Sequence, residues 1–181
     1  MGKIKVSDKT FKPYISNESI EKAIDAVALR LNADYAKRNE PPVLLCVLNG
    51  SIMFTAELMK RLNFDLELIS IKLSSYCGTE CSGQVRQVMG MTGSVKGKDV
   101  LVVEDIVDTG GTIEDLKSIL AGEGAREVKI CTMLFKPEVF KKDFPIDYVA
   151  MEIPKAFILG YGLDYNELGR NYKDIYVLDE D

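Results

Sequence analysis

Three carboxylates and a glycine-rich turn follow one apolar run of the chain. The run ends at Val103, Glu104 and Asp105 come next, and Asp108 precedes the turn Thr109-Gly110-Gly111-Thr112. Backbone N–H groups of a glycine turn at the start of a helix favour an anion such as phosphate. Two adjacent acids at the buried end of a strand are costly unless they hold a cation or polar hydroxyl groups. The combination predicts a site for a phosphorylated ligand, with a metal ion or a cationic reacting centre beside the acids.

Other kinds of site explain this motif less well. An isolated Asp-Thr-Gly-Gly-Thr segment is also typical of an ordinary helix cap with a tight turn, but the two preceding acids favour the anion site. The chain contains no histidine, which excludes Ser-His-Asp and Cys-His catalysis. It also lacks the P-loop motif of many ATPases and the glycine motif of dinucleotide-binding domains. A P-loop ATPase site and a dinucleotide site are therefore not indicated.

The elements around the motif alternate between short apolar runs and helical patterns. Helices are predicted from a cap at Ser16 or Asn17 to Tyr35, from 51 to about 62, and over 112–121. A long polar loop is predicted over 74–84. The predicted strands are 43–48, 66–73, 85–91, 100–103, 128–134, 148–151, 157–159 and 175–178. This order predicts an α/β fold with a mostly parallel, twisted sheet flanked by helices.

Ligands of such sheets bind at the carboxyl ends of the parallel strands. Three polar turns follow predicted strands: Asn49-Gly50-Ser51, Glu104–Thr112 and Lys136-Pro137. We therefore expect these turns to lie at one edge of the sheet, where they form the site together.

Length and composition indicate one domain of ordinary size. The chain has 181 residues, 46% of them hydrophobic, and a net charge of −5. An acidic protein is poorly suited to nonspecific nucleic-acid binding, which needs a basic surface. No apolar run approaches the roughly 20 residues that span a bilayer, and the N-terminus lacks the apolar core of a signal peptide. We therefore expect a cytoplasmic protein that binds neither nucleic acid nor membranes.

The run from 100 to 112 resembles the phosphoribosyl-diphosphate motif of type I phosphoribosyltransferases. Four further segments resemble the 6-oxopurine branch of that family, the hypoxanthine or hypoxanthine-guanine phosphoribosyltransferases. These segments are Val47–Ser51, Ser74–Tyr76, Leu134–Pro137 and Glu152–Glu167. The resemblance extends in one order from about residue 43 to the end. It implies the type I phosphoribosyltransferase fold as a single domain over 1–181, with a small hood contributed by the N-terminus and the region after about residue 136.

The resemblance implies an enzyme of purine salvage. Such an enzyme transfers the 5-phosphoribosyl group from phosphoribosyl diphosphate to N9 of hypoxanthine, and also of guanine, giving IMP or GMP and diphosphate. The implied cofactor is Mg²⁺, held by Glu104, Asp105 and Asp164. The implied assembly is a homodimer or a homotetramer.

The resemblance also assigns roles on the phosphate side of the site. Glu104 and Asp105 contact the ribose hydroxyls, directly or through Mg²⁺, and Asp108 moves a proton at N7 of the purine. The 5′-phosphate is bound by Thr109, Gly110, Gly111 and Thr112. Diphosphate is bound by Leu48, Asn49 and Gly50, often with a cis peptide between the first two residues, and by Arg170.

The remaining implied roles concern the purine and a mobile loop. Lys136 donates to the exocyclic O6, and Phe157 stacks on the ring. Ile158 pairs with the base through its backbone, and Asp164 lies near the base and helps to hold a second Mg²⁺. Ser75 and Tyr76 belong to the mobile loop that closes over the site.

Two positions depart from common family members, and two alternatives stay open. Asn49 stands where many relatives have a lysine, which implies that diphosphate binding depends more on Mg²⁺ and Arg170. Gly111 replaces a longer residue of the phosphate turn. One alternative is an enzyme of the same fold that acts on xanthine or adenine, although adenine enzymes lack this arrangement around Lys136. The other is a regulator of the same fold that senses phosphoribosyl diphosphate and binds RNA or DNA.

Overall fold

The computed structural model describes residues 2–75 and 85–180, which form ten strands and three helices. In chain order these are β1 (Ile4–Val6), β2 (Lys9–Ile15), α1 (Asn17–Tyr35), β3 (Val43–Leu48), α2 (Ile52–Met59), β4 (Glu67–Ser75), β5 (Val85–Met89), β6 (Asp99–Val107), α3 (Gly111–Gly122), β7 (Glu127–Phe135), β8 (Tyr148–Glu152), β9 (Ile158–Leu159) and β10 (Ile175–Leu178). None of the helices in these two described ranges has the length and apolar character needed to cross a membrane.

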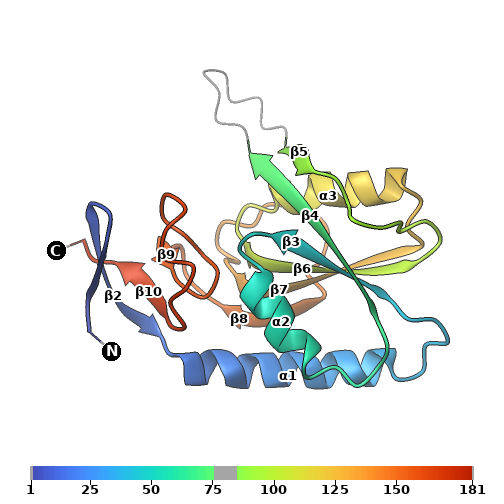
Figure 1. The fold of residues 1–181 in the computed structure, drawn as a ribbon, viewed down its shortest axis with the longest axis horizontal. Helices are drawn as coiled ribbons and strands as arrows, with labels where there is room; N and C mark the ends of the chain where they lie inside the picture. The colour runs from blue at the N-terminus through green and yellow to red at the C-terminus, as the bar shows by residue number, and fades with distance from the viewer. Residues whose placement is uncertain (1, 76–84, 181) are drawn as a thin grey trace.

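The larger sheet has six strands in the order β5-β4-β3-β6-β7-β8. All neighbours from β4 to β8 are parallel, and only β5 at the edge is antiparallel. Helices cover both of its faces, with α1 and α2 on one side and α3 on the other (Figure 1). The predicted α/β fold with a mostly parallel sheet is therefore confirmed.

Alternating residues of the central strands explain these two layers. Leu44 and Leu101 pack in the core beneath α1 and α2, whereas their neighbours Leu45 and Val102 pack in the core beneath α3. All four are fully buried. Successive side chains of a strand point to opposite faces, so strands that are apolar at every position require cover on both sides.

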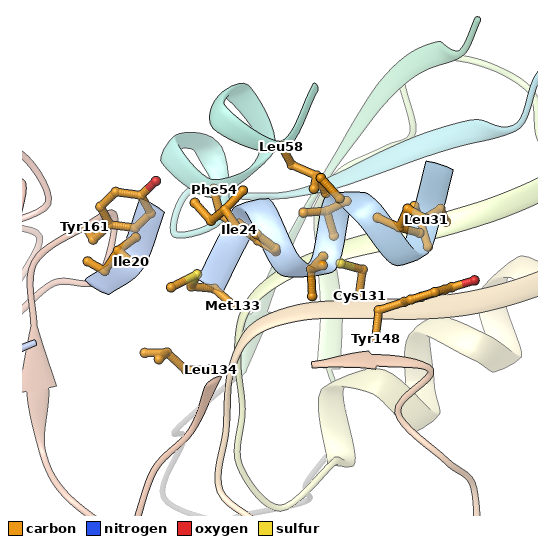
Figure 2. Packing of buried hydrophobic residues seen from close by; sticks show 14 of the residues in the cluster. Ile20, Ile24, Leu31, Phe54, Leu58, Cys131, Met133, Leu134, Tyr148 and Tyr161 are labelled. Carbon is orange, nitrogen blue, oxygen red and sulfur yellow. The ribbon is translucent and has the colours of Figure 1, made fainter. Parts of the chain in front are cut away.

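Helix α1 shows why this cover forms where it does. Ser16 caps it by accepting a hydrogen bond from the Ser19 N–H at 3.2 Å. Its buried side chains recur at helical spacing and face β7, β8 and α2 (Figure 2). At the far end, the Tyr148 hydroxyl donates to Asp34 at 2.7 Å, which ties the helix to β8.

The smaller sheet has the order β1-β2-β10-β9 and is antiparallel throughout. It joins the two ends of the chain, at the left of Figure 1. The sequence did not predict β1 and β2, because β1 has only three residues and β2 contains Lys9, Lys12 and Pro13, which weaken a strand pattern. Phe11, in the middle of β2, is fully buried. The Asn17 N–H donates to the buried Asp174 at 2.7 Å, which links this sheet to the start of α1.

Several predicted boundaries differ from the structure. Strand β6 continues to Val107, so Glu104 and Asp105 lie inside the strand and not in a turn after it. Helix α2 ends at Met59 and not near 62. Ser74 and Ser75 belong to β4, and the rest of the loop predicted over 74–84 lies outside the described residues.

Candidate active site

A cavity of about 350 Å³ lies at the carboxyl edge of the larger sheet. The turn after β3, the end of β6 and the start of α3 form most of its wall, as the sequence predicted for two of the three polar turns. Leu73 and Arg170 complete it. The full wall is Val47–Gly50, Leu73, the ten residues from Glu104 to Ile113, and Arg170. The third polar turn, Lys136-Pro137, does not line the cavity, but Lys136 contacts the lining residue Asp108.

Glu104 and Asp105 place a buried and a half-buried carboxyl group on adjacent positions of β6. The Asp105 N–H donates to Glu104 Oε1 at 3.3 Å, and the Ile106 N–H donates to Asp105 Oδ1 at 2.7 Å. Burial, reinforced by the neighbouring Asp105 carboxylate, raises the pKa of Glu104 well above its ordinary value. Burial also raises the pKa of Asp105, although the Arg170 guanidinium opposes the shift. A cation placed at this pair would remove much of the cost of its charge.

The turn after β3 approaches this pair very closely. The Leu48–Asn49 peptide bond is cis, as the resemblance of this segment implied. A Cβ atom at Gly50 would overlap the Asp105 carboxylate, so only glycine fits at this position. A Cβ atom at Gly162 would in turn overlap the carbonyl oxygen of Gly50. The sequence indicated Gly50, but it gave no signal for this contact with Gly162.

The phosphate turn lies at the start of α3. Gly110 has a φ of +85° and precedes the helix, so the first N–H groups of α3 are free to bind an anion. Thr109 and Thr112 are exposed beside them. Phe140 and Lys142 pack behind the turn and leave no room for a side chain at Gly110. These two supporting residues were not predicted, because they come from an irregular segment after β7.

Asp108, a residue of the cavity wall, forms an ion pair with Lys136. Lys136 Nζ lies 3.1 Å from Asp108 Oδ2, and the Lys136 side chain is 9% exposed while that of Asp108 is 51% exposed. The Lys136 N–H donates to the Val107 carbonyl at 3.0 Å, which fixes the start of the third polar turn against the end of β6. The structure thus places a proton acceptor beside a donor cation.

Arg170 lines the cavity and is held by three oxygens. It donates to the Gly162 carbonyl at 2.8 Å, to Asp164 at 2.6 Å and to Glu167 at 3.0 Å. The second carboxylate oxygen of Asp164 accepts from the Glu167 N–H at 2.8 Å. Asp164 is therefore paired with Arg170 and does not join Glu104 and Asp105. Glu167 is a further residue that sequence reasoning did not single out.

The predicted purine residues lie apart from this wall. Phe157 is 46% exposed and contacts the rings of Phe11 and Tyr165, with centroids 6.2 and 5.8 Å away. Ile158 lies in β9, where its side chain is buried and its backbone pairs with Val177. The side chain of Ser75 and all of Tyr76 lie outside the described residues.

The donor set fits Mg²⁺ in one respect. Mg²⁺ prefers oxygen ligands and is usually held by one or two carboxylates together with substrate phosphates, and the adjacent Glu104 and Asp105 supply two carboxyl groups at the cavity wall. Within residues 2–75 and 85–180, no three such side chains gather to hold a metal by themselves. The arrangement is therefore suited to a metal that arrives with a phosphorylated substrate.

Comparisons with known proteins agree with this geometry. A phosphoribosyl transferase domain model matches residues 13–166. The chain is 40% identical over 171 residues to a hypoxanthine-guanine phosphoribosyltransferase of Streptococcus pneumoniae, covering 94% of each protein. It is 38% identical to one of Bacillus subtilis over 168 residues, covering 92% of each.

Solved structures give the same result. A hypoxanthine phosphoribosyltransferase of Staphylococcus aureus superposes with a TM-score of 0.85 at 36% identity, covering 93% of this chain and 91% of that one. One of Trypanosoma cruzi superposes with a TM-score of 0.87 at 37% identity, covering 97% and 95%.

Proposed function

The chain belongs to the phosphoribosyl transferase family, and we propose that its cavity transfers the 5-phosphoribosyl group from phosphoribosyl diphosphate to N9 of hypoxanthine, and also of guanine. The reaction gives IMP or GMP and diphosphate, and it serves purine salvage. The observation that carries this proposal is the joint placement, in one cavity, of the adjacent carboxyl groups of Glu104 and Asp105, a glycine turn at a helix start and Arg170.

Each part of the cavity suits one part of phosphoribosyl diphosphate. The free N–H groups at the start of α3 and the hydroxyls of Thr109 and Thr112 bind the 5′-phosphate. Arg170 and the backbone of the Leu48–Gly50 turn bind the diphosphate. Glu104 and Asp105 bind the ribose hydroxyls and hold Mg²⁺, which, when bound, neutralises charge on the leaving diphosphate. The same carboxylates stabilise the positive charge that develops at C1′ as the bond to diphosphate breaks.

The Asp108–Lys136 pair suits the edge of a 6-oxopurine. N7 and O6 lie side by side on that edge, so an acceptor and a donor 3.1 Å apart can face both atoms together. N9 attacks C1′, and Asp108 takes up or stabilises the proton at N7. Lys136 donates to O6. An adenine amino group at this position would place a donor against the ammonium, which disfavours adenine.

Several finer points stay predictions. Phe157, Ile158 and Asp164 complete the purine site, and Ser75 and Tyr76 close over it. The whole chain acts as one domain, with the smaller sheet as its hood. Mg²⁺ dependence, a cytoplasmic location and assembly into a homodimer or homotetramer follow from the family. No described feature favours a nucleic-acid-binding regulator, and the net charge of −5 does not supply the basic face that such a role needs.

A spectrophotometric assay tests this function directly. The protein is supplied with phosphoribosyl diphosphate, Mg²⁺ and one of hypoxanthine, guanine, xanthine or adenine. We expect turnover of hypoxanthine and guanine, loss of turnover without Mg²⁺, and a rate about 100-fold lower in Asp108→Asn, the range typical of a lost general base. Asp25→Asn, on the exposed face of α1, is the matched control and should keep full activity. Absence of turnover with every base by folded protein would contradict the proposal.

A further inference from the structure

We propose that Glu167 is a positioning residue that fixes Arg170 for the diphosphate group. This inference rests on the proposed function, since it concerns the same cavity. Arg170 lines the cavity, whereas Glu167 does not. Glu167 therefore acts on the substrate only through the arginine.

The contacts of Arg170 show how this positioning operates. Nη1 donates to the Gly162 carbonyl, and Nη2 lies against both the Asp164 and Glu167 carboxylates. A guanidinium carries five N–H donors in a rigid plane, so three contacts at two nitrogens determine its orientation. Nε and the second Nη1 hydrogen have no partner in the described part of the chain and are available for an anion.

Glu167 also fixes Asp164, the other carboxylate on the same nitrogen. Its backbone N–H donates to Asp164 Oδ2 at 2.8 Å, while Asp164 Oδ1 contacts Arg170 at 2.6 Å. One residue thus controls both carboxylates that hold the guanidinium: one through its side chain, the other through its backbone.

The backbone conformation of Glu167 is the second observation. Asn166 and Glu167 form the two-residue loop between the bridge partners Tyr165 and Leu168, with φ values of +53° and +64°. Loops of this kind strongly favour Asn-Gly, because both central residues need a positive φ. Asn166 fits this pattern, but Glu167 occupies the position where glycine would adopt the positive φ with the least backbone strain.

Burial of the Glu167 side chain does not offset this strain, because the side chain is 77% exposed. The visible gain from a glutamate side chain is its contact with Arg170, because the backbone N–H that donates to Asp164 would be present in any residue here except proline. Strained residues of this kind occur where function needs a particular side chain. An arginine that is already oriented loses less conformational freedom when the diphosphate binds, so the strain serves substrate binding and not folding.

Three variants separate positioning from loop stability. Glu167→Gly removes the carboxylate and relieves the strain, Glu167→Gln keeps an oxygen that accepts from Arg170, and Asn166→Gly is the matched control at the neighbouring strained position. We expect Glu167→Gly to raise KM for phosphoribosyl diphosphate about three- to fivefold, the size typical of a lost exposed ion pair. KM for hypoxanthine and kcat should change less than about twofold. Glu167→Gln should recover most of the loss.

Thermal unfolding and diphosphate binding complete the test. Glu167→Gly should unfold at the same or a higher temperature than the wild type, because glycine suits a positive φ, so weaker binding together with unchanged or greater stability excludes a folding defect. An equal KM in Glu167→Gly and Asn166→Gly would overturn the proposal. So would a KM below that of the wild type, since the carboxylate would then only compete for Arg170.

The outcome stays separable from the proposed function. If the wild type turned over no base, the proposed reaction would fail. The positioning role would then be decided by calorimetric titration of the same variants with diphosphate and Mg²⁺, where Glu167→Gly should again bind several-fold more weakly than Asn166→Gly.

Discussion

The two ends of β6 carry acids in opposite situations. At its start, Asp99 lies 2.5 Å from Arg38 and 2.7 Å from Arg126, and these partners lower its pKa. Towards its far end, the buried Glu104 lies beside the half-buried Asp105, and loss of solvation raises the pKa values of both carboxyl groups. Two arginines form ion pairs with the first acid, whereas within the described residues neither Glu104 nor Asp105 has an ion-pair partner, and Arg170 acts on Asp105 only through its nearby charge. An acid with ion-pair partners in its own chain stabilises the fold, whereas an acid with a raised pKa and no ion-pair partner indicates a functional site.

The surroundings of Asp99 support this distinction. Arg38 also pairs with Glu127 at 2.6 Å and lies 4.4 Å over the ring of Tyr35. The ring of Tyr35 in turn stacks on Phe64, with centroids 5.0 Å apart. This network joins α1, β6 and β7 at the amino edge of the sheet, the edge opposite the cavity. The network therefore stabilises the packing of α1 against β6 and β7.

The largest expected effect on activity comes from removing the charges of Glu104 and Asp105. The double variant Glu104→Gln, Asp105→Asn should lower kcat/KM at least about 100-fold, since preorganised charges at a reacting centre typically contribute this much. The same variant, free of ligand, should unfold at an equal or higher temperature, because two buried like charges are no longer forced together. Enzyme assays and calorimetric melting measure the two effects. A variant that lost stability together with activity would show that the pair supports the fold and would break the comparison.

Glycine substitutions near each end of β6 give a smaller effect. Gly50→Ala places a methyl group against the Asp105 carboxylate and should lower activity about tenfold or more and stability by about 1–3 kcal/mol through overpacking. Gly97→Ala is the matched control, because Gly97 has a φ of +72° but open space around it, two residues before Asp99. It should cost about 1–2 kcal/mol of stability from backbone strain alone. Urea unfolding and kcat/KM separate the two variants, and an unchanged activity of Gly50→Ala would contradict the tight fit at Asp105.

The same strand shows what the sequence could and could not predict. The apolar run before Glu104 predicted a buried strand, and the acids with the glycine turn predicted the site. The strand appeared to end at the first charge, yet Ile106 and Val107 continue it, and Val107 is 2% exposed. That apolar pair was an available signal for a longer strand. The acids interrupt the pattern because they serve the site, and functional positions are where local rules fail.

Other parts of the site depend on contacts between distant segments, and such contacts leave no local pattern. Position 162 accommodates only glycine, because the Gly50 carbonyl lies too close for a Cβ atom. Phe140 packs against Gly110 and likewise leaves no space for a side chain there. The strands β1 and β2 were missed for a related reason: Val6 and Phe11 become buried only where they meet Leu159 of β9 and Tyr176 of β10. Periodicity identifies elements that bury much of their own surface, and these strands do not.

The smallest effect on activity is expected for Asp99→Asn, which tests the role of the acid at the start of β6. This variant removes a mostly buried carboxylate from two arginines and should cost about 1–3 kcal/mol at neutral pH, the range for hydrogen bonds to charged groups. Asp25→Asn removes an exposed partner of Arg61 and should cost less than about 1 kcal/mol. Neither position touches the cavity, so kcat/KM should stay unchanged in both variants.

The pH dependence of this cost has a definite sign. The arginines hold the pKa of Asp99 below its ordinary value of 3.8, so the unfolded chain takes up a proton at this residue before the folded protein does. The stability that the carboxylate contributes is therefore complete above about pH 4–5 and is lost as the pH falls through the lower folded value. Urea unfolding of the wild type and Asp99→Asn should give free energies of unfolding that differ by the same amount from pH 7 to about pH 5. Below that, down to pH 3, the difference should become smaller. A difference that widened in acid would mean that Asp99 is not held as a charged partner of the arginines, and the contrast between the two ends of β6 would disappear.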